Sequence, residues 1–127
     1  AFVGGVPTLP EAAIDLPIGR NPSKPSTFRV DAKCKSANTI YKQRATNGKI
    51  SLVELKPTTG RTHQLRVHMS YIGTPIVGDV VYGQPADRLM LHAYSLTILL
   101  PSGENKTFTA QVPDLFVDKA TEVGYEF

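Results

Sequence analysis

The chain has 127 residues, a formal net charge of +3, a single cysteine and 41% hydrophobic residues. This length and composition are typical of one globular domain, residues 1–127, which buries enough surface to fold without disulfide bonds. The single Cys34 excludes an internal disulfide and a cysteine-based zinc site, and it favours a reducing, cytoplasmic location. The longest apolar run, Leu96 to Pro101, is far shorter than the roughly 20 residues of a membrane-spanning helix.

The pattern predicts turns and short strands in the first half of the chain. Closely spaced prolines and glycines mark residues 1–28 as turn-rich, with an edge strand at Ile14–Ile18, where a proline is tolerated. Two β-prone runs, 38–45 and 49–56, flank the pair Asn47-Gly48. Asn-Gly between two such runs is a strong hairpin signal, so we expect these runs to pair.

The periodicity becomes helical after this hairpin. Leu65, Met69 and Ile72 recur at helical spacing, and Gly73 follows them as a stop. A helix over residues 62–72 is therefore predicted.

The last third of the chain is predicted to be mainly extended. Residues 76–83 have the pattern of short extended pieces around turns. Residues 88–100 are so rich in apolar side chains that we expect a long, buried central strand, with residues 106–112 returning antiparallel to it. Residues 113–123 favour a short helix with a proline in its first turn. Taken together, these elements predict an α+β domain with a mostly antiparallel mixed sheet and a few short helices.

Positive charge is concentrated in the middle of the chain. Residues 29–53 contain six basic side chains against one acid, whereas residues 104–127 contain five acids against two lysines. The six are Arg29, Lys33, Lys35, Lys42, Arg44 and Lys49. This uneven distribution of charge favours a nucleic-acid partner, contacted through its phosphates, over an acidic small substrate. Solvated lysines on strand faces give the same pattern, so charge alone does not decide between the two.

The densest group of polar side chains lies at the start of the predicted helix. The run Gly60–Met69 brings two arginines, a histidine and a glutamine close to the unpaired amides of a helix N-terminus, which can bind phosphate. Helical geometry puts Arg66 at the edge of the buried face, where its guanidinium can hold a carboxylate through two hydrogen bonds. A capped amphipathic helix with no such role explains the same residues equally well.

Other common chemistries find little support. His63 and His68 are five residues apart, which is not the spacing of a helical zinc site, so we expect no metal. Cys34 lies between two lysines that would lower its pKa, but it has no recognisable partner base. The sequence contains no G-x-S-x-G and no G-x-x-x-x-G-K motif, which excludes the usual hydrolase and phosphate-loop types of site.

A longer pattern is more specific. Residues 51–69, continuing through 72–79 to Tyr82-Gly83, closely resemble the RluA-type pseudouridine synthases. The resemblance extends over nearly the whole chain. Its outer parts are Pro17-Ile18-Gly19-Arg20, the run from Lys35 to Tyr41, the run from Arg88 to Ala93 and the run from Ala110 to Phe116. One departure is Cys34, where the family usually has a glycine before the lysine.

The resemblance implies an enzyme that isomerises uridines in ribosomal or transfer RNA without a cofactor. Such an enzyme flips the target base from its stack and uses an essential aspartate, a tyrosine against the base and an arginine paired with the aspartate. By motif that arginine corresponds to Arg66. Arg61, His63 and Gln64 would shape the cleft or touch RNA, and Leu91 would pack against the flipped base.

Two parts of the family pattern are missing. The aspartate of the family lies in a His-Arg-Leu-Asp motif that this sequence does not contain, and Asp87-Arg88-Leu89-Met90 is only a look-alike. The tyrosine motif, Lys-x-Tyr, would fall just before Ala1. The amino end has neither an initiator methionine nor the layout of a signal peptide. We therefore expect the C-terminal portion of a catalytic domain, inactive alone, in which Arg66 is the partner of an absent aspartate.

The alternative is a non-catalytic RNA-binding module that kept the fold. In that case the basic residues would bind RNA phosphates, and the affinity would fall steeply with salt. The sequence leaves the RNA, the uridine and the oligomeric state open.

Overall fold

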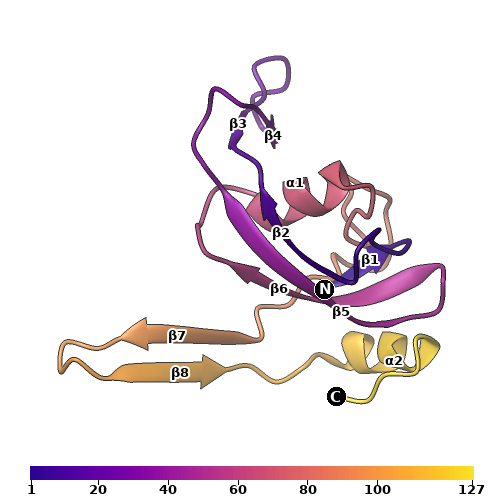
Figure 1. Cartoon of the computed structure of the whole chain (residues 1–127). Helices are drawn as coiled ribbons and strands as arrows, with labels where there is room; N and C mark the ends of the chain where they lie inside the picture. Colours follow the sequence, from indigo (N-terminus) through magenta and orange to yellow (C-terminus); the bar gives the residue numbers. More distant parts are fainter.

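A computed structural model describes residues 1–127 as a four-stranded sheet with a helix on each face and two separate two-stranded ribbons (Figure 1). The strands are β1 (Phe2–Gly4), β2 (Glu11–Asp15), β3 (Ile18–Arg20), β4 (Phe28–Val30), β5 (Asn38–Thr46), β6 (Ile50–Pro57), β7 (Ser95–Leu99) and β8 (Asn105–Thr109). The helices are α1 (Gln64–Tyr71) and α2 (Asp114–Glu122). The α+β class is confirmed, and every strand pairing is antiparallel.

The predicted hairpin forms the centre of the main sheet, whose strand order is β1-β6-β5-β2. Its turn is held by the Asn47 side chain, which accepts hydrogen bonds from the amides of Lys49 and Ile50. An edge strand forms close to the predicted one but with other bounds: β2 covers Glu11–Asp15, so only Ile14 and Asp15 of the predicted Ile14–Ile18 belong to it, and Ile18 begins β3. Pro17 lies beyond it, because a proline has no N–H to donate to the ladder.

The two faces of the sheet carry separate cores. Neighbouring residues of β6 point to opposite faces. Leu52 joins the α2 core with Phe2 and Phe116, whereas Val53 joins the α1 core with Met69. The sheet is therefore the middle layer between the two helices, as Figure 1 shows.

The helices differ little from their predicted ranges. The helix α1 begins two residues later than predicted, and Pro113 is the N-cap of α2. At eight and nine residues, neither could cross a membrane.

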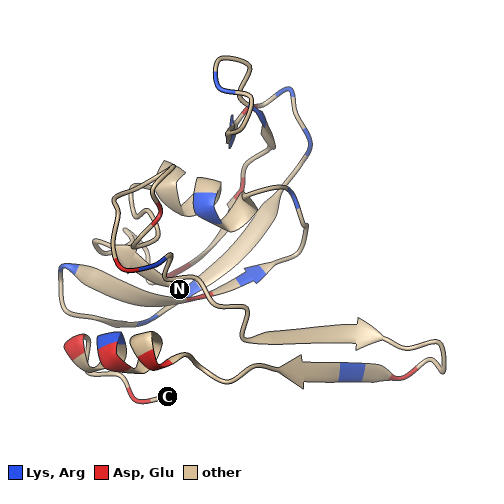
Figure 2. Cartoon of the chain, turned by 180° about the vertical axis from the view of Figure 1, so that it is seen from behind, with Lys and Arg blue, Asp and Glu red and all other residues tan.

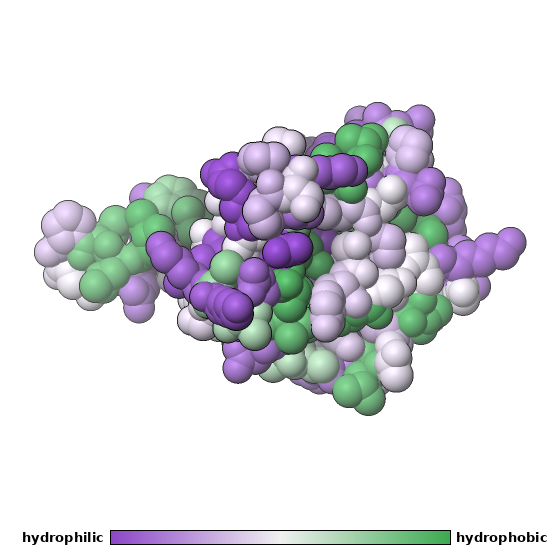
Figure 3. All heavy atoms as spheres, turned by 90° about the horizontal axis from the view of Figure 1, so that it is seen from above, coloured by the Kyte–Doolittle hydropathy of each residue, from purple (hydrophilic) through white to green (hydrophobic).

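The prediction of a long, buried strand over residues 88–100 is wrong. Only Ser95–Leu99 is extended as β7, and all five of its residues are exposed. It pairs with β8, as expected for the antiparallel return, but with no strand of the main sheet. In Figure 1 this β7–β8 ribbon projects from the body, and in Figure 3 the projection is largely hydrophobic. An apolar sequence is buried only where another element covers it, and no other element of this chain covers the ribbon.

The β3–β4 ribbon, in contrast, is anchored. Ile18, Ala37 and Val67 form a small core between this ribbon and α1, with Phe28 and Tyr82 packed against it. This core places the basic segment that follows β4 beside the start of α1.

Candidate active site

The start of α1 is held by an unusual backbone conformation. His63, the N-cap residue, has φ 56° and ψ 20°, which is left-handed and rare for a residue with a side chain. Its carbonyl accepts the first helical hydrogen bond, from the amide of Val67 at 2.8 Å. Such a conformation costs on the order of 1 kcal/mol and persists because the surrounding contacts fix it.

Gln64 supplies several of those contacts. It is 3% exposed, and its Oε1 accepts hydrogen bonds from the Thr59 hydroxyl at 2.7 Å and the Arg61 amide at 3.0 Å. Its Nε2 donates to the Asn38 carbonyl and the Thr39 hydroxyl. All its hydrogen-bonding groups are thus used within the chain, and Gln64 builds the site instead of offering a free group to RNA.

His68 extends this network into the core. It is fully buried, and its Nε2 donates to the Leu16 carbonyl at 2.8 Å. Its Nδ1 then accepts from the Thr39 hydroxyl, also at 2.8 Å, which is the arrangement of a neutral imidazole. Burial lowers the pKa of His68 and outweighs the opposing effects of the Leu16 carbonyl and the Asp15 charge.

Arg66, one turn into the helix, is paired within this chain. Its Nε and Nη2 donate to the two carboxylate oxygens of Asp79, each at 2.9 Å. The predicted two-point hold on a carboxylate is therefore present, with Asp79 as its acceptor. The hydrogen bond to Asp79 raises the pKa of Arg66 above its ordinary value, against the effect of burial.

Asp79 is itself fixed by its own loop. It is 1% exposed, and its Oδ1 also accepts from the amides of Val81 and Tyr82. Burial raises the pKa of Asp79, but the hydrogen bonds from Arg66 and these two amides outweigh it, so the pKa lies below its usual value. Gly78 precedes it with φ 82°, and a Cβ there would lie 1.8 Å from the Arg88 carbonyl oxygen. Only glycine fits at this position.

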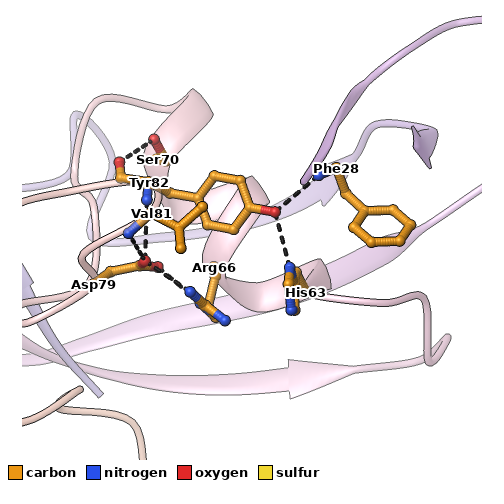
Figure 4. Close-up of polar contacts among 7 residues, drawn as sticks. All are labelled: Phe28, His63, Arg66, Ser70, Asp79, Val81 and Tyr82. Atoms are coloured by element: carbon orange, nitrogen blue, oxygen red, sulfur yellow. Dashed lines mark hydrogen bonds and ion pairs between the residues drawn. The ribbon is translucent and has the colours of Figure 1, made fainter. Parts of the chain in front are cut away.

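Tyr82 connects Arg66 with His63 and the β3–β4 ribbon (Figure 4). Its ring lies 5.2 Å from the Arg66 guanidinium carbon. Its hydroxyl accepts from the Phe28 amide at 2.9 Å and lies 2.8 Å from His63 Nδ1. Since the Phe28 amide is a donor, the hydroxyl proton is free to go to Nδ1 of a neutral His63. Burial and the Arg66 charge lower the pKa of His63, against the opposing charge of Asp79.

The residues predicted for the site meet around one hollow of about 220 Å³. The five predicted residues that line it are Arg61, His63, Gln64, Arg66 and Leu91. Leu65 lines it as well, so the hollow combines two cationic side chains with two leucines. Arg61 is only partly free, because its Nε donates to the Ser36 carbonyl at 3.0 Å.

The six basic residues are all exposed, but they do not form one surface. In Figure 2 the blue Lys and Arg segments lie at widely separated places on the chain. Arg29, Lys33 and Lys35 lie in β4 and the segment after it, which Arg61 contacts through Ser36. Lys49 lies in the β5–β6 turn, at the other end of a nine-residue strand and so roughly 30 Å away.

Lys42 and Arg44 lie on another face again. Thr39, earlier in the same strand, points to α1 and forms a hydrogen bond with His68. Arg44 instead forms an ion pair with Glu54 on the opposite face of the sheet. Glu54 also lies 3.7 Å from Lys56. These two basic residues therefore point away from the hollow.

Comparison with known proteins assigns this geometry to a family. The family model described as RNA pseudouridylate synthase matches residues 3–71, more than half of the chain. The chain belongs to the RNA pseudouridylate synthase family. It is 44% identical over 125 residues to an uncharacterized RNA pseudouridine synthase of Zymomonas mobilis, covering 93% of this chain and 57% of the relative. It is 42% identical over 119 residues to the dual-specificity RNA pseudouridine synthase RluA of Escherichia coli, covering 87% and 54%.

A solved structure agrees with this assignment. Human RNA pseudouridylate synthase domain containing 1 superposes with a TM-score of 0.76 at 33% identity, covering 94% of this chain and 54% of that one. The chain thus spans a little more than half the length of these members of the RNA pseudouridylate synthase family.

Two residues of this family member were missed as site residues by sequence reasoning. Asp79 and Tyr82 both lie within the stretch that resembles the family, but no spacing rule linked them to Arg66. The signal that could have indicated this loop was an aspartate directly after a glycine. Aspartate side chains commonly accept hydrogen bonds from the amides two and three residues further on. No three histidine, cysteine, aspartate or glutamate side chains gather into a group that could hold a metal.

Proposed function

We propose that this chain is the C-terminal portion of the catalytic domain of an RNA pseudouridine synthase that acts on uridines of ribosomal or transfer RNA in the cytoplasm. Three findings support this proposal: the family membership, the share of the relatives that the chain spans, and the absence of a His-Arg-Leu-Asp motif from the sequence. The reaction breaks the bond from C1′ to N1 and forms one from C1′ to C5, while a proton leaves C5 and N1 gains one. No atom or electron is supplied from outside.

The observation that carries the proposal is that the Arg66 guanidinium is only partly hydrogen-bonded. Its Nε and Nη2 are taken by Asp79, its Nη1 has no hydrogen-bond partner in the chain, and the residue lines the hollow. A second carboxylate, from the part of the protein that carries the family's aspartate, would bind this free edge and stay ionised beside the permanent charge. Leu91 and Leu65 would offer apolar contact to the flipped uracil.

The RNA backbone would approach from the side of the β3–β4 ribbon. Lys33 and Lys35 are exposed on the segment that Arg61 contacts, and Arg29 is exposed on β4 just before it. Lys42, Arg44 and Lys49 point to other surfaces, so we propose the first three, with Arg61, as the phosphate contacts nearest the target base.

The test compares two proteins: this chain alone and the chain extended by its upstream coding sequence. Each is incubated with RNA labelled with tritium at C5 of uridine, and tritium release is measured. We expect turnover by the extended protein and none by the chain alone. Turnover by the chain alone would contradict the proposed need for an outside aspartate, and no turnover by an extended protein that does contain the aspartate motif would contradict the synthase.

The second candidate, a non-catalytic RNA-binding module, is favoured by the exposed basic residues near Arg61. It predicts binding whose affinity falls steeply between 50 and 200 mM salt, on the order of tenfold or more for a few phosphate contacts, with no turnover by either protein. Salt-dependent binding alone fits both functions, so tritium release decides between them.

A further inference from the structure

We propose that Asp79 is a positioning residue that fixes the orientation of Arg66 and so turns the Nη1 edge of the guanidinium toward the hollow. This inference rests on the proposed function, because the orientation serves a carboxylate that would bind there. Asp79 itself does not reach substrate, since it is 1% exposed and its oxygens already accept four hydrogen bonds.

The hold on Arg66 acts from two directions. A carboxylate that accepts from both Nε and Nη2 fixes the plane of a guanidinium and its rotation within that plane. The Tyr82 ring, 5.2 Å from the guanidinium carbon, limits movement out of the plane. The single nitrogen without a partner, Nη1, is thereby left with a defined direction.

Asp79 can hold Arg66 because its own position is fixed by the backbone. Its oxygen accepts the Val81 and Tyr82 amides, and the Asp79 carbonyl accepts the amide of Gly83 at 2.8 Å. The loop is tied to α1 a second time, where the Ser70 hydroxyl donates to the Tyr82 carbonyl at 2.9 Å. This second tie does not involve Arg66, so it offers a matched control.

The first arm of the experiment reads the orientation directly and needs no activity. In this chain labelled with ¹⁵N, solvent exchange of the Arg66 Nε–H is measured by NMR, with the signal assigned by its loss in Arg66→Lys. We expect slow exchange in wild type and in Ser70→Ala, and at least tenfold faster exchange in Asp79→Asn, whose amide cannot accept at both oxygen positions. Equal exchange in wild type and Asp79→Asn would overturn the proposal.

The second arm measures the consequence in the extended protein under single-turnover conditions. We expect Asp79→Asn to slow pseudouridine formation by about 10- to 100-fold, because a misplaced catalytic contact costs rates of this order. RNA affinity should stay within about threefold, because Asp79 is buried, and Ser70→Ala should stay within about threefold in both quantities. Equal slowing in the two variants would show that loop stability matters instead and would overturn the proposal.

The two arms separate this inference from the proposed function. If the wild-type extended protein forms no pseudouridine, the proposed function fails, and the exchange rates alone decide whether Asp79 holds Arg66.

Discussion

Two parts of the molecule differ in which side chains they expose to solvent: one buries polar side chains, and the other exposes apolar ones. The Arg66 corner, defined as Gln64, Arg66, His68, Asp79 and Tyr82, consists of polar side chains that are buried or half-buried and hydrogen-bonded to one another or to the backbone. The β7–β8 ribbon carries the large apolar side chains Leu96, Ile98, Leu99 and Phe108, yet all ten of its strand residues are exposed. In these two regions, therefore, the polarity of a side chain alone does not decide whether it is buried.

The difference between the two regions lies in their partners. Buried polar groups are tolerated when each has a hydrogen-bond partner, which the corner supplies from α1, β5 and the loop after Gly78. Apolar groups are buried only when another element covers them, and the ribbon has only its own two strands. The corner is thus complete within this chain, except for one edge of one guanidinium.

The largest effect should follow the loss of Arg66. In Arg66→Ala the buried Asp79 charge loses its partner, and we expect the free energy of unfolding to fall by about 3 kcal/mol. The control Arg61→Ala removes only an exposed contact to Ser36 and should cost less than about 1 kcal/mol. Urea unfolding measures both losses, and equal losses would contradict the distinction.

A loss of about 2 kcal/mol is expected for Gln64→Leu. Leucine fills similar space but leaves the groups that Gln64 pairs with, including the Arg61 amide and the Thr39 hydroxyl, short of partners. The same change at the exposed Gln111 should stay within about 0.5 kcal/mol. Thermal unfolding of the pair measures the difference, and a neutral Gln64→Leu would show that the network contributes nothing.

The corner should also make stability depend on pH. Burial lowers the pKa of His68 below its ordinary value of about 6.5, so below that pH the unfolded chain takes up a proton that the folded chain excludes. Stability is therefore full above about pH 6.5 and falls below it, by at most about 1.4 kcal/mol per pH unit for this proton. His63, whose pKa is also lowered, adds a change of the same sign.

Urea titrations at pH 7.5 and 5.5 test this dependence in wild type and His68→Gln. The variant starts less stable but loses less on acidification. An unchanged pH dependence in the variant would remove His68 from the explanation.

The smallest effect should come from the ribbon. Leu99 is 70% exposed, so Leu99→Ala should change stability by less than about 0.5 kcal/mol. The same substitution at Leu52, which is 5% exposed in the α2 core, should cost about 2 to 5 kcal/mol. A comparable loss at Leu99 would mean that the ribbon is covered in solution.

Local sequence signals predicted the parts of the fold that depend on local contacts. The Asn47-Gly48 turn, the helical spacing of Leu65 and Met69 and the proline before α2 were each sufficient to predict their elements. The buried strand over residues 88–100 was wrong because composition cannot show which element covers a strand.

The site was predicted only in part, because local patterns show what one residue can do but not which distant residue it contacts. The position of Arg66 at the edge of the buried face followed from helical geometry, and its need for a carboxylate followed from its chemistry. Its partner Asp79 is thirteen residues away across a loop, and no periodicity connects the two. The charge run from Arg29 to Lys49 predicted contacts to nucleic-acid phosphates but not where each residue lies, because alternation along β5 and the length of the hairpin distribute those residues over separate faces.

The most direct test of the account is the rate of pseudouridine formation by the extended protein carrying Arg66→Lys, measured at saturating RNA together with RNA affinity. Lysine keeps the charge but cannot hold Asp79 at two points and present a third nitrogen to another carboxylate. We expect a rate at least 100-fold below wild type, with an RNA affinity within about threefold of wild type. A variant that isomerises uridine at the wild-type rate would contradict the central role given to the Arg66 guanidinium.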